Sequence, residues 1–450
     1  MRKFVAIHNL GCKVNAYETE GMAEKLIRAG FSVVSFDERA DFYVVNTCSV
    51  TNIADRKSRQ MLHRARKLNP DAVIIAVGCY VDTHGREGVC QDGVDIALPN
   101  TEKENIVEVI KAWEESHGAE EEETEEPEIS ASYGEIIRSS GEERHISGEG
   151  IYTRKFLKVQ DGCNMFCSYC IIPYARGRIR SKGISEVLSE IASLTEKGYR
   201  EFVLTGIHLS SYGLERPEDK EDLLKLIMEA DRLPGVRRLR LGSLEPRIIT
   251  EEFARGLKGA KSICPHFHLS LQSGSDTVLK RMNRHYTAAE YLQSVEILRS
   301  YFDDPALTTD VITGFPGETE EEFKETYDFI KRTGFYETHI FPYSRRKGTA
   351  ADRMDGQLVN SVKHERLATL QALDSENRKK YEDRHIGKCA EVLFEDGNEG
   401  YTREYIRVKC PNGKIKCGEI HTGTITGRNP AEGVMELEIN EIRKIHDKNA

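Results

Sequence analysis

The first 113 residues alternate short runs of valine and isoleucine with longer segments whose apolar positions recur at helical spacing. The apolar runs cover 3–9, 31–36, 41–47, 72–78 and 94–100, and the helical patterns cover 17–30, 54–70 and 101–116. Near-continuous apolar strands separated by helices are typical of a parallel sheet with helices on both faces. The pattern therefore predicts a parallel α/β domain of flavodoxin-like type over residues 1–113.

A second alternation of strands and helices begins near residue 151. Its six strand candidates are residues 154–160, 201–208, 236–243, 266–272, 306–315 and 337–343. Six βα units are too many for a small open sheet and fewer than the eight of a closed βα barrel. We expect a partial (βα)6 barrel over residues 151–384.

The pattern changes again at residue 385, where short strands and turn residues replace helices. The strand candidates are residues 389–396, 404–417, 421–427 and 434–439, and Asn412-Gly413 is a hairpin signal. This segment predicts a small antiparallel β-barrel over residues 385–450.

Composition and charge place the chain among ordinary soluble proteins. Of its 450 residues 39% are hydrophobic, and no apolar run approaches the roughly 18 residues of a membrane helix. The formal charge is −10, but residues 114–128 hold nine glutamates and no lysine or arginine, which leaves −1 for the remainder. We expect a cytoplasmic protein without membrane contact, with an acidic linker over residues 114–150.

Three of the eleven cysteines stand close together, at C-x3-C-x2-C spacing: Cys163, Cys167 and Cys170. An odd cysteine number in a long chain argues against a secreted disulfide framework. A structural zinc ion takes four ligands, whereas an iron-sulfur cluster held by three cysteines keeps one iron open for another ligand. The triplet therefore favours an iron-sulfur cluster.

This spacing, with Tyr169 just before the last cysteine, resembles the radical S-adenosylmethionine (SAM) superfamily. The resemblance implies a 4Fe-4S cluster on the three cysteines, whose open iron binds SAM and splits it into methionine and a 5′-deoxyadenosyl radical. Other residues at predicted strand ends then become candidate SAM contacts, although each alone is equally consistent with a turn or with core packing. They are Thr205, Gly206, Ser243, Glu245, Gln272 and Asp310, and Tyr169 of the cysteine motif is the seventh candidate.

The N-terminal domain has three more cysteines, each at or just past the carboxyl end of a predicted strand: Cys12, Cys48 and Cys79. Parallel α/β sheets bind their ligands at this edge. However, separations of 36 and 31 residues match no local metal motif, so both buried free thiols and a shared metal site remain open.

Three stretches that contain these cysteines, "NLGCKVNAYETE", "VVNTCSVT" and "AVGCY", closely resemble the N-terminal domain of methylthiotransferases. The resemblance implies that Cys12, Cys48 and Cys79 hold a second 4Fe-4S cluster with an open iron. "GYTREYIRV" is similar to the RNA-binding TRAM domain of the same enzymes, and "GCKVN" followed by "YETE" is similar to the branch that acts on threonylcarbamoyladenosine at position 37 of tRNA. One departure is Arg180-Ser181-Lys182-Gly183, where the family usually has Arg-Ser-Arg-Pro, so no fixed role is assigned to Lys182.

The resemblance implies a radical SAM enzyme that inserts a methylthio group at C2 of threonylcarbamoyladenosine, using two SAM molecules and two 4Fe-4S clusters. Its partners would be the tRNA anticodon loop, a low-potential electron donor such as a flavodoxin or ferredoxin, and a sulfur donor. The alternatives are a methylthiotransferase for another modified adenosine or a ribosomal protein side chain, and a non-catalytic iron-sulfur RNA-binding protein.

Local basic runs supply the candidate phosphate contacts, because the total charge gives none. One run lies on a predicted helix, and a second lies beside the cysteine triplet. A third lies in the C-terminal barrel with Tyr401 and Tyr405; it would either bind RNA or form a solvated sheet edge. The basic residues are Arg56, Lys57, Arg59, Arg64, Arg66, Lys67, Arg176, Arg178, Arg180, Lys182, Arg403, Arg407, Lys409, Lys414 and Lys416.

Overall fold

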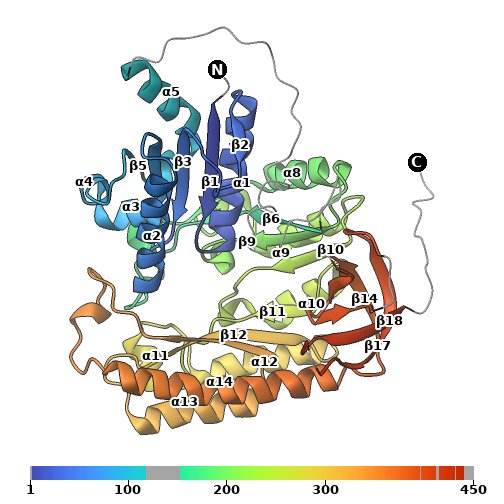
Figure 1. Cartoon of the computed structure of the whole chain (residues 1–450). Helices are drawn as coiled ribbons and strands as arrows, with labels where there is room; N and C mark the ends of the chain where they lie inside the picture. Colours follow the sequence, from blue (N-terminus) through green and yellow to red (C-terminus); the bar gives the residue numbers. More distant parts are fainter. Residues whose placement is uncertain (1–2, 118–152, 396, 412–414, 431, 440–450) are drawn as a thin grey trace.

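The computed structural model describes residues 3–117, 153–395, 397–411, 415–430 and 432–439. It contains the three predicted units: an N-terminal parallel sheet, a partial βα barrel and a small closed β-barrel (Figure 1). The expected acidic linker lies outside the described residues from position 118 on. No helix in the described ranges is long and apolar enough to cross a membrane.

The N-terminal unit is a five-stranded parallel sheet in the order β2-β1-β3-β4-β5, as the flavodoxin-like prediction requires. Its strands are β1 (Phe4–Asn9), β2 (Ser32–Val34), β3 (Phe42–Thr47), β4 (Val73–Gly78) and β5 (Ile96–Leu98). Its helices are α1 (Lys13–Arg28), α2 (Asn52–Leu68), α3 (Cys79–His84), α4 (Arg86–Cys90) and α5 (Ile106–Ser116), with a 3-10 helix at Asn100–Asn105. Leu26 and Ile110 pack on one face of the sheet and Leu62 packs on the other, so both faces are covered.

The middle unit is a curved sheet of six parallel strands that does not close. It consists of two three-stranded halves, β6-β9-β10 and β11-β12-β13, joined by the bridges Leu239↔Ile263 and Leu244↔Leu269. The strands are β6 (Arg154–Lys158), β9 (Glu201–Thr205), β10 (Arg238–Leu241), β11 (His266–His268), β12 (Ala306–Thr313) and β13 (Glu337–Pro342). The predicted (βα)6 barrel is thereby confirmed.

Helices follow the barrel strands and enclose the largest apolar core of the chain. They are α7 (Ile172–Arg176), α8 (Ile184–Glu196), α9 (Leu223–Asp231), α10 (Glu251–Gly259), α11 (Asp276–Arg281), α12 (Ala288–Tyr301), α13 (Glu320–Thr333) and α14 (Asn360–Asp383). Minor elements are the strands β7 (Gln160–Asp161) and β8 (Arg180–Ser181) and 3-10 turns at Leu209–Ser211, Pro217–Asp219, Pro246–Ile248 and Ala351–Arg353. Thr287 and Thr319 start α12 and α13 with capping boxes, which fixes where these two helices begin.

The C-terminal unit is a closed five-stranded barrel in the order β14-β15-β16-β18-β17. Its strands are β14 (Cys389–Phe394), β15 (Glu399–Thr402), β16 (Arg407–Lys409), β17 (Ile420–Arg428) and β18 (Met435–Ile439). β16 pairs with β15 and, in parallel, with β18. The predicted Asn412-Gly413 turn lies outside the described residues, and the sequence pattern did not indicate β15.

Buried arginines attach the C-terminal barrel to the middle unit. Arg238 donates to the backbone oxygens of Glu391 (2.7 Å) and Tyr401 (3.0 Å), and Arg240 donates to those of Thr402 (2.7 Å) and Arg403 (2.8 Å). Both guanidinium groups also contact Glu201, which is fully buried. Burial alone would raise the pKa of Glu201, but Arg240, Arg154 and Arg238 lower it to about 2, so Glu201 is their carboxylate counter-ion.

Candidate functional site

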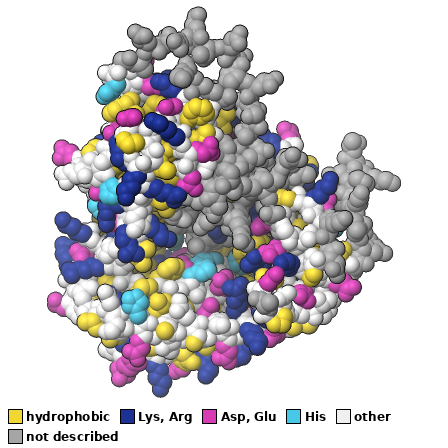
Figure 2. Space-filling model, viewed as in Figure 1, with side chains coloured by type: hydrophobic (Ala, Val, Ile, Leu, Met, Phe, Trp, Pro, Cys, Tyr) yellow, Lys and Arg dark blue, Asp and Glu magenta, His cyan; other side chains and the backbone are white. Residues whose placement is uncertain are grey.

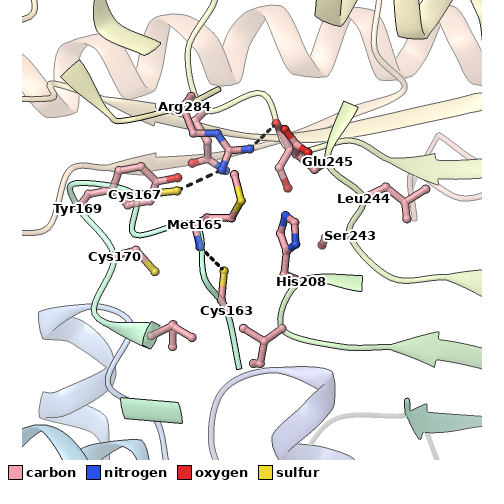
Figure 3. Close-up of a pocket in the computed structure, with 14 residues that line it drawn as sticks. Cys163, Met165, Cys167, Tyr169, Cys170, His208, Ser243, Leu244, Glu245 and Arg284 are labelled. Carbon is pink, nitrogen blue, oxygen red and sulfur yellow. Dashed lines mark hydrogen bonds between the residues drawn. The ribbon is translucent and has the colours of Figure 1, made fainter. Parts of the chain in front are cut away.

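The Cys163/Cys167/Cys170 triplet lies on the loop between β7 and α7, where the three thiols line a single pocket (Figure 3). Backbone hydrogen bonds fix the loop: Cys163 N donates to Gly177 O (3.1 Å), and Cys170 N donates to Cys167 O (2.9 Å). Gly162 has φ +69, and a Cβ there would lie 1.9 Å from the carbonyl oxygen of Arg178. Any side chain at this position would collide with that oxygen, so the backbone path into Cys163 requires glycine at position 162.

Burial governs the electrostatics of the three thiols. It raises the pKa of Cys163, and it raises the pKa of Cys170 to about 12, with Cys167 adding to both effects. The Arg284 guanidinium donates a hydrogen bond to Sγ of Cys167 (3.3 Å) and is the cation facing the triplet. Cys167 is buried, and Cys163 and Cys170 are half-buried. Three thiols that face one space beside an arginine fit an iron-sulfur cluster, whose iron would hold them as thiolates.

Four of the seven predicted SAM contacts line this same pocket: Tyr169, Ser243, Glu245 and Gln272. They come from the cysteine loop and from the segments after β10 and β11, so the carboxyl ends of the strands converge as in complete βα barrels. Gln272 adopts φ +70, an uncommon backbone conformation for this residue type. The space between these residues, with the open solvent at its mouth included, is about 620 Å³.

The other three predicted SAM contacts do not line the pocket. Thr205 ends β9 and is buried, and Gly206 packs so closely on Gln160 that a Cβ would lie 2.7 Å from its side-chain oxygen. Asp310 lies on β12, where its carboxylate is 3.3 Å from Nε2 of His268. Burial would raise the pKa of Asp310, but His268, His339 and Lys13 together lower it.

Two titratable residues of the pocket escaped the sequence analysis: His208 and Arg284. Burial lowers the pKa of His208 to about 4, so its imidazole is neutral at pH 7, and its Nε2 is buried without a hydrogen-bond partner among the described residues. His208 follows β9, so the rule that ligands gather at strand ends could have found it. Arg284 follows α11, far from the triplet in sequence, and no local signal marks it.

The second triplet also gathers as the sheet topology requires. Cys12, Cys48 and Cys79 follow β1, β3 and β4, which are adjacent strands. Cys48 and Cys79 are buried and Cys12 is exposed. Burial raises the pKa of Cys48 to about 12, and the charges of Cys79 and Cys12 add to this effect. Because the three cysteines follow adjacent parallel strands, they lie at one edge of the sheet.

The backbone around the second triplet approaches the thiols closely. Gly11 has φ +103, and a Cβ there would lie 2.8 Å from Sγ of Cys48. Asn100 Nδ2 lies 3.5 Å from Sγ of Cys79, and the Cys48 amide donates to Oγ of Ser58 (3.4 Å). Three convergent thiols beside an obligatory glycine fit a second cluster of the same kind.

Arg176 connects the regions of the two triplets and corrects its predicted role as a phosphate contact. It is only 3% exposed; Nη1 and Nη2 each lie 3.0 Å from the Glu18 carboxylate, and Nη1 lies 3.1 Å from Asp161. Nη2 also donates to Oδ1 of Asn15 (2.5 Å), and Asn100 Nδ2 donates to Ala175 O (3.3 Å). A guanidinium enclosed in this way joins α1 to the cysteine loop and cannot meet RNA.

Several aromatic and basic residues of the C-terminal barrel also face inward. Tyr405 stacks on His266 with ring centroids 5.0 Å apart, and Arg154 donates to its hydroxyl (2.5 Å). Arg154 also lies over the Tyr401 ring at 4.9 Å, and Arg403 donates to the carbonyl of Ile263 (2.7 Å). These side chains hold the two barrels together, which corrects the expectation that they face RNA.

The basic face of α2 remains accessible. Arg56, Lys57, Arg64 and Lys67 are exposed, and Figure 2 shows lysine and arginine side chains gathered along this edge of the N-terminal unit. Beside the cysteine loop, Arg178 and Arg180 are exposed, whereas Lys182 bonds to Tyr17 and Glu190. In the C-terminal barrel Lys416 is exposed, and Lys414 lies outside the described residues. The surviving phosphate candidates therefore lie on α2, next to the first triplet and at Lys416.

Comparison with known proteins agrees with this arrangement. The model of the "Radical SAM superfamily" matches residues 157–330, and the model described as "Uncharacterized protein family UPF0004" matches residues 4–98. The threonylcarbamoyladenosine tRNA methylthiotransferase MtaB of Bacillus subtilis is 42% identical over 416 residues, covering 90% of this chain and 89% of the relative. The tRNA-2-methylthio-N(6)-dimethylallyladenosine synthase of Caldicellulosiruptor saccharolyticus is 32% identical, covering 89% and 85%.

Among solved structures, the radical SAM methyltransferase TsrM of Kitasatospora setae, with cobalamin and a [4Fe-4S] cluster bound, matches with a TM-score of 0.56. The match covers 78% of this chain and 74% of TsrM at 18% identity. At this identity the likeness extends to the fold alone.

Proposed function

Because the chain belongs to the radical SAM methylthiotransferases, we propose that it inserts a methylthio group at C2 of N6-threonylcarbamoyladenosine, position 37, beside the tRNA anticodon. The observation that carries the proposal is the pair of cysteine triplets, each gathered at the carboxyl edge of its own parallel sheet. The choice of nucleoside rests on relatives of that name, which match at 42%, 38% and 37% identity. Relatives named for dimethylallyladenosine match at 32% and 34% and support the alternative nucleoside less well.

Two 4Fe-4S clusters would be held by this chain, one by Cys163, Cys167 and Cys170 and one by Cys12, Cys48 and Cys79. The first cluster, with one SAM, would supply the radical chemistry needed at C2 of adenine, and the second would supply the sulfur that another SAM would methylate.

The protein's own residues bind and orient these groups. Tyr169, Ser243, Glu245 and Gln272 line the wall where SAM would bind, and Arg284 balances the negative charge of the thiolates. Thr205 ends β9, and Gly206 follows it in close contact with Gln160, so these two residues would act through the backbone behind the pocket. His208 would meet the bound groups as a neutral imidazole, because burial lowers its pKa to about 4.

The tRNA anticodon loop is the partner that these surfaces suit, with α2 and the loop of Arg178 and Arg180 contacting phosphate. A low-potential electron donor and a sulfur donor complete the proposed partners. The domain limits that we propose are 1–113, 114–150, 151–384 and 385–450, with the last as the RNA-binding TRAM domain.

Mass spectrometry of nucleosides tests this function. Digested tRNA from a strain that lacks the gene should contain threonylcarbamoyladenosine without its methylthio form, and the wild-type gene should restore it. Loss of methylthio-dimethylallyladenosine instead would assign the other nucleoside. Unchanged tRNA would leave a ribosomal protein side chain or a non-catalytic role.

A further inference from the structure

Three side chains of a kind that binds metal ions meet on the inner face of the barrel, apart from both cysteine triplets. They come from three neighbouring parallel strands: His268 ends β11, Asp310 lies on β12 and His339 lies on β13. Asp310 and His339 are paired in register. One ring nitrogen of each histidine and one carboxylate oxygen of Asp310 all lie within 4.8 Å of one another. Residues that are distant in the sequence thus present a compact set of nitrogen and oxygen donors.

The distance between two of these donors matches the spacing of ligands around one small ion. Nε2 of His268 lies 3.3 Å from Oδ2 of Asp310. Metal bonds of about 2.0 to 2.2 Å, at tetrahedral or octahedral angles, place neighbouring ligand atoms about 2.8 to 3.6 Å apart. Nε2 is buried and has no hydrogen-bond partner among the described residues, so the contact with Asp310 is not a hydrogen bond. A bound cation would satisfy both atoms.

Thr308 holds the His268 ring in an orientation that suits metal binding. Nδ1 of His268 lies 3.0 Å from Oγ1 of Thr308, and the two residues are paired in register between β11 and β12. When Nδ1 carries the ring proton and donates it to this hydroxyl oxygen, Nε2 keeps its lone pair. Histidine ligands of metal ions are typically held by such a hydrogen bond from the other ring nitrogen.

The three side chains face the interior of the barrel, where solvent reaches them. Val311 packs in the apolar core, so the alternation of the strand turns Asp310, its neighbour, toward the interior. The side chain of Asp310 is 30% exposed, that of His268 is 12% exposed, and His339 is exposed. Closed βα barrels fill such inward positions with valine, isoleucine and leucine. Here the interior is polar and accessible to an ion.

The group of His268, Asp310 and His339 lies beside the pocket of the first cysteine triplet. The backbone amide of Gln272 donates to the carbonyl oxygen of Asp310 (2.8 Å). Gln272 lines the pocket, and so does Ser270, which follows His268 by two residues. An ion held by the three side chains would therefore lie next to the wall of the pocket.

We propose that His268, Asp310 and His339 bind one divalent transition-metal ion that is separate from both clusters. Two imidazoles and one carboxylate are a ligand set that zinc and ferrous iron accept. Three protein ligands leave at least one position for water or for an oxygen atom of a bound molecule, so the ion would act as a Lewis acid beside the pocket. This inference goes beyond the proposed function and does not depend on which nucleoside is modified.

Zinc binding to the anaerobic holoenzyme tests the proposal. Enzyme with both clusters reconstituted is passed over a chelating resin and titrated with zinc in competition with a chromophoric chelator. The wild type should bind one equivalent of zinc with its iron content unchanged. A wild type that binds no zinc would overturn the proposal and would leave His268 and Asp310 as a metal-free ion pair.

Variants identify the ligands. His339→Gln and Asp310→Asn should weaken zinc binding by more than about 100-fold, because loss of a hydrogen-bonded partner of a ligand already costs about 10- to 100-fold. Thr308→Val removes only such a partner and should weaken binding within that smaller range. His364→Gln is the matched control, because His364 is exposed on α14 and bonds to its own helix at Asn360, and it should bind zinc as the wild type does.

Iron content and circular dichroism show whether each variant is folded with its clusters intact. His339 is exposed, so its replacement is the least disturbing of the ligand changes. Wild-type zinc affinity in folded His339→Gln and Asp310→Asn would overturn the proposal.

X-ray absorption at the zinc edge locates the ion independently of the variants. The site predicts only nitrogen and oxygen ligands, at about 2.0 to 2.2 Å. Sulfur ligands at about 2.3 Å would show that zinc occupies a cysteine triplet in place of a cluster, and this result would also overturn the proposal. Neither outcome bears on the proposed function, which the nucleosides of tRNA decide.

Discussion

Replacing Arg176 by methionine should loosen the contact between the N-terminal sheet and the cysteine loop. The guanidinium is buried and makes close contacts with Glu18, Asp161 and Asn15. Removing one partner of a buried ion pair costs about 3 to 5 kcal/mol, because the remaining charge is left without compensation. Methionine keeps much of the side-chain volume, so the change tests the charge and its hydrogen bonds.

The expected cost lies at the lower end of that range. Glu18 would still contact Lys103 (2.7 Å) and Lys158 (2.8 Å), and Lys158 also lies 3.1 Å from Asp161. Burial would raise the pKa of Glu18, but Lys103, Arg176 and Lys158 hold it well below its usual value, so two of its three cations remain in the variant. A loss of about 3 kcal/mol corresponds to a roughly 150-fold increase in the equilibrium constant for local opening.

Hydrogen exchange followed by mass spectrometry can measure this opening locally, which a single melting temperature cannot do in a chain of several units. Peptides from α1 and α7 should exchange faster in Arg176→Met than in the wild type, with peptides from α12 unchanged. Arg180→Met is the matched control, because Arg180 also contacts Asp161 (3.3 Å) but is 53% exposed, where such a pair contributes within about 1 kcal/mol. Equal exchange in both variants would refute the reasoning.

Three further predictions follow from the cysteine triplets and the buried carboxylate. Cys79→Ala should halve the iron of reconstituted enzyme and abolish the methylthio product while still forming 5′-deoxyadenosine. Cys167→Ala should form neither the methylthio product nor 5′-deoxyadenosine. Methylthio product from Cys79→Ala would contradict the separate roles of the two triplets. Gly11→Ala should lower iron content in the same way, because its Cβ would meet Cys48, and normal iron would show that the loop adjusts. Arginines lower the folded-state pKa of Glu201 to about 2, so its contribution of about 3 kcal/mol is complete above pH 4.5 and is lost as pH falls toward 2. Glu201→Gln should remove that part of the acid sensitivity in calorimetry, and an identical acid profile would contradict it.

The strand order and both cysteine triplets could be predicted because they depend on local patterns and one topological rule. Apolar runs mark parallel strands, and parallel strands in one sheet bring their carboxyl ends to a common edge. Cys12, Cys48 and Cys79 meet for this reason despite their separation in sequence. The same rule placed Ser243 and Gln272 at the first triplet.

The orientation of polar side chains could not be predicted in the same way. The pattern marked Arg176 and Tyr405 as basic and aromatic, but it does not say whether a side chain meets solvent or another unit of the chain. Both lie in contacts between segments far apart in sequence. Asp310 lies beside His268 and His339 in the barrel. Inward-facing positions along one strand lie at different levels along the barrel axis, and the prediction that a residue lies near a strand end does not fix its level.

The hydrogen bonds by which Arg238 and Arg240 hold the C-terminal barrel affect how the sequence of this barrel can change in evolution. Most of their contacts are to main-chain oxygens of Glu391, Tyr401, Thr402 and Arg403, which every amino acid supplies. Side chains on that barrel can therefore change between lineages without loss of its contact with the middle unit, provided that the strands keep their backbone path. A C-terminal barrel transplanted from a distant relative should dock on this chain, so exchange of whole modules offers a route to new RNA preferences with the radical chemistry left intact.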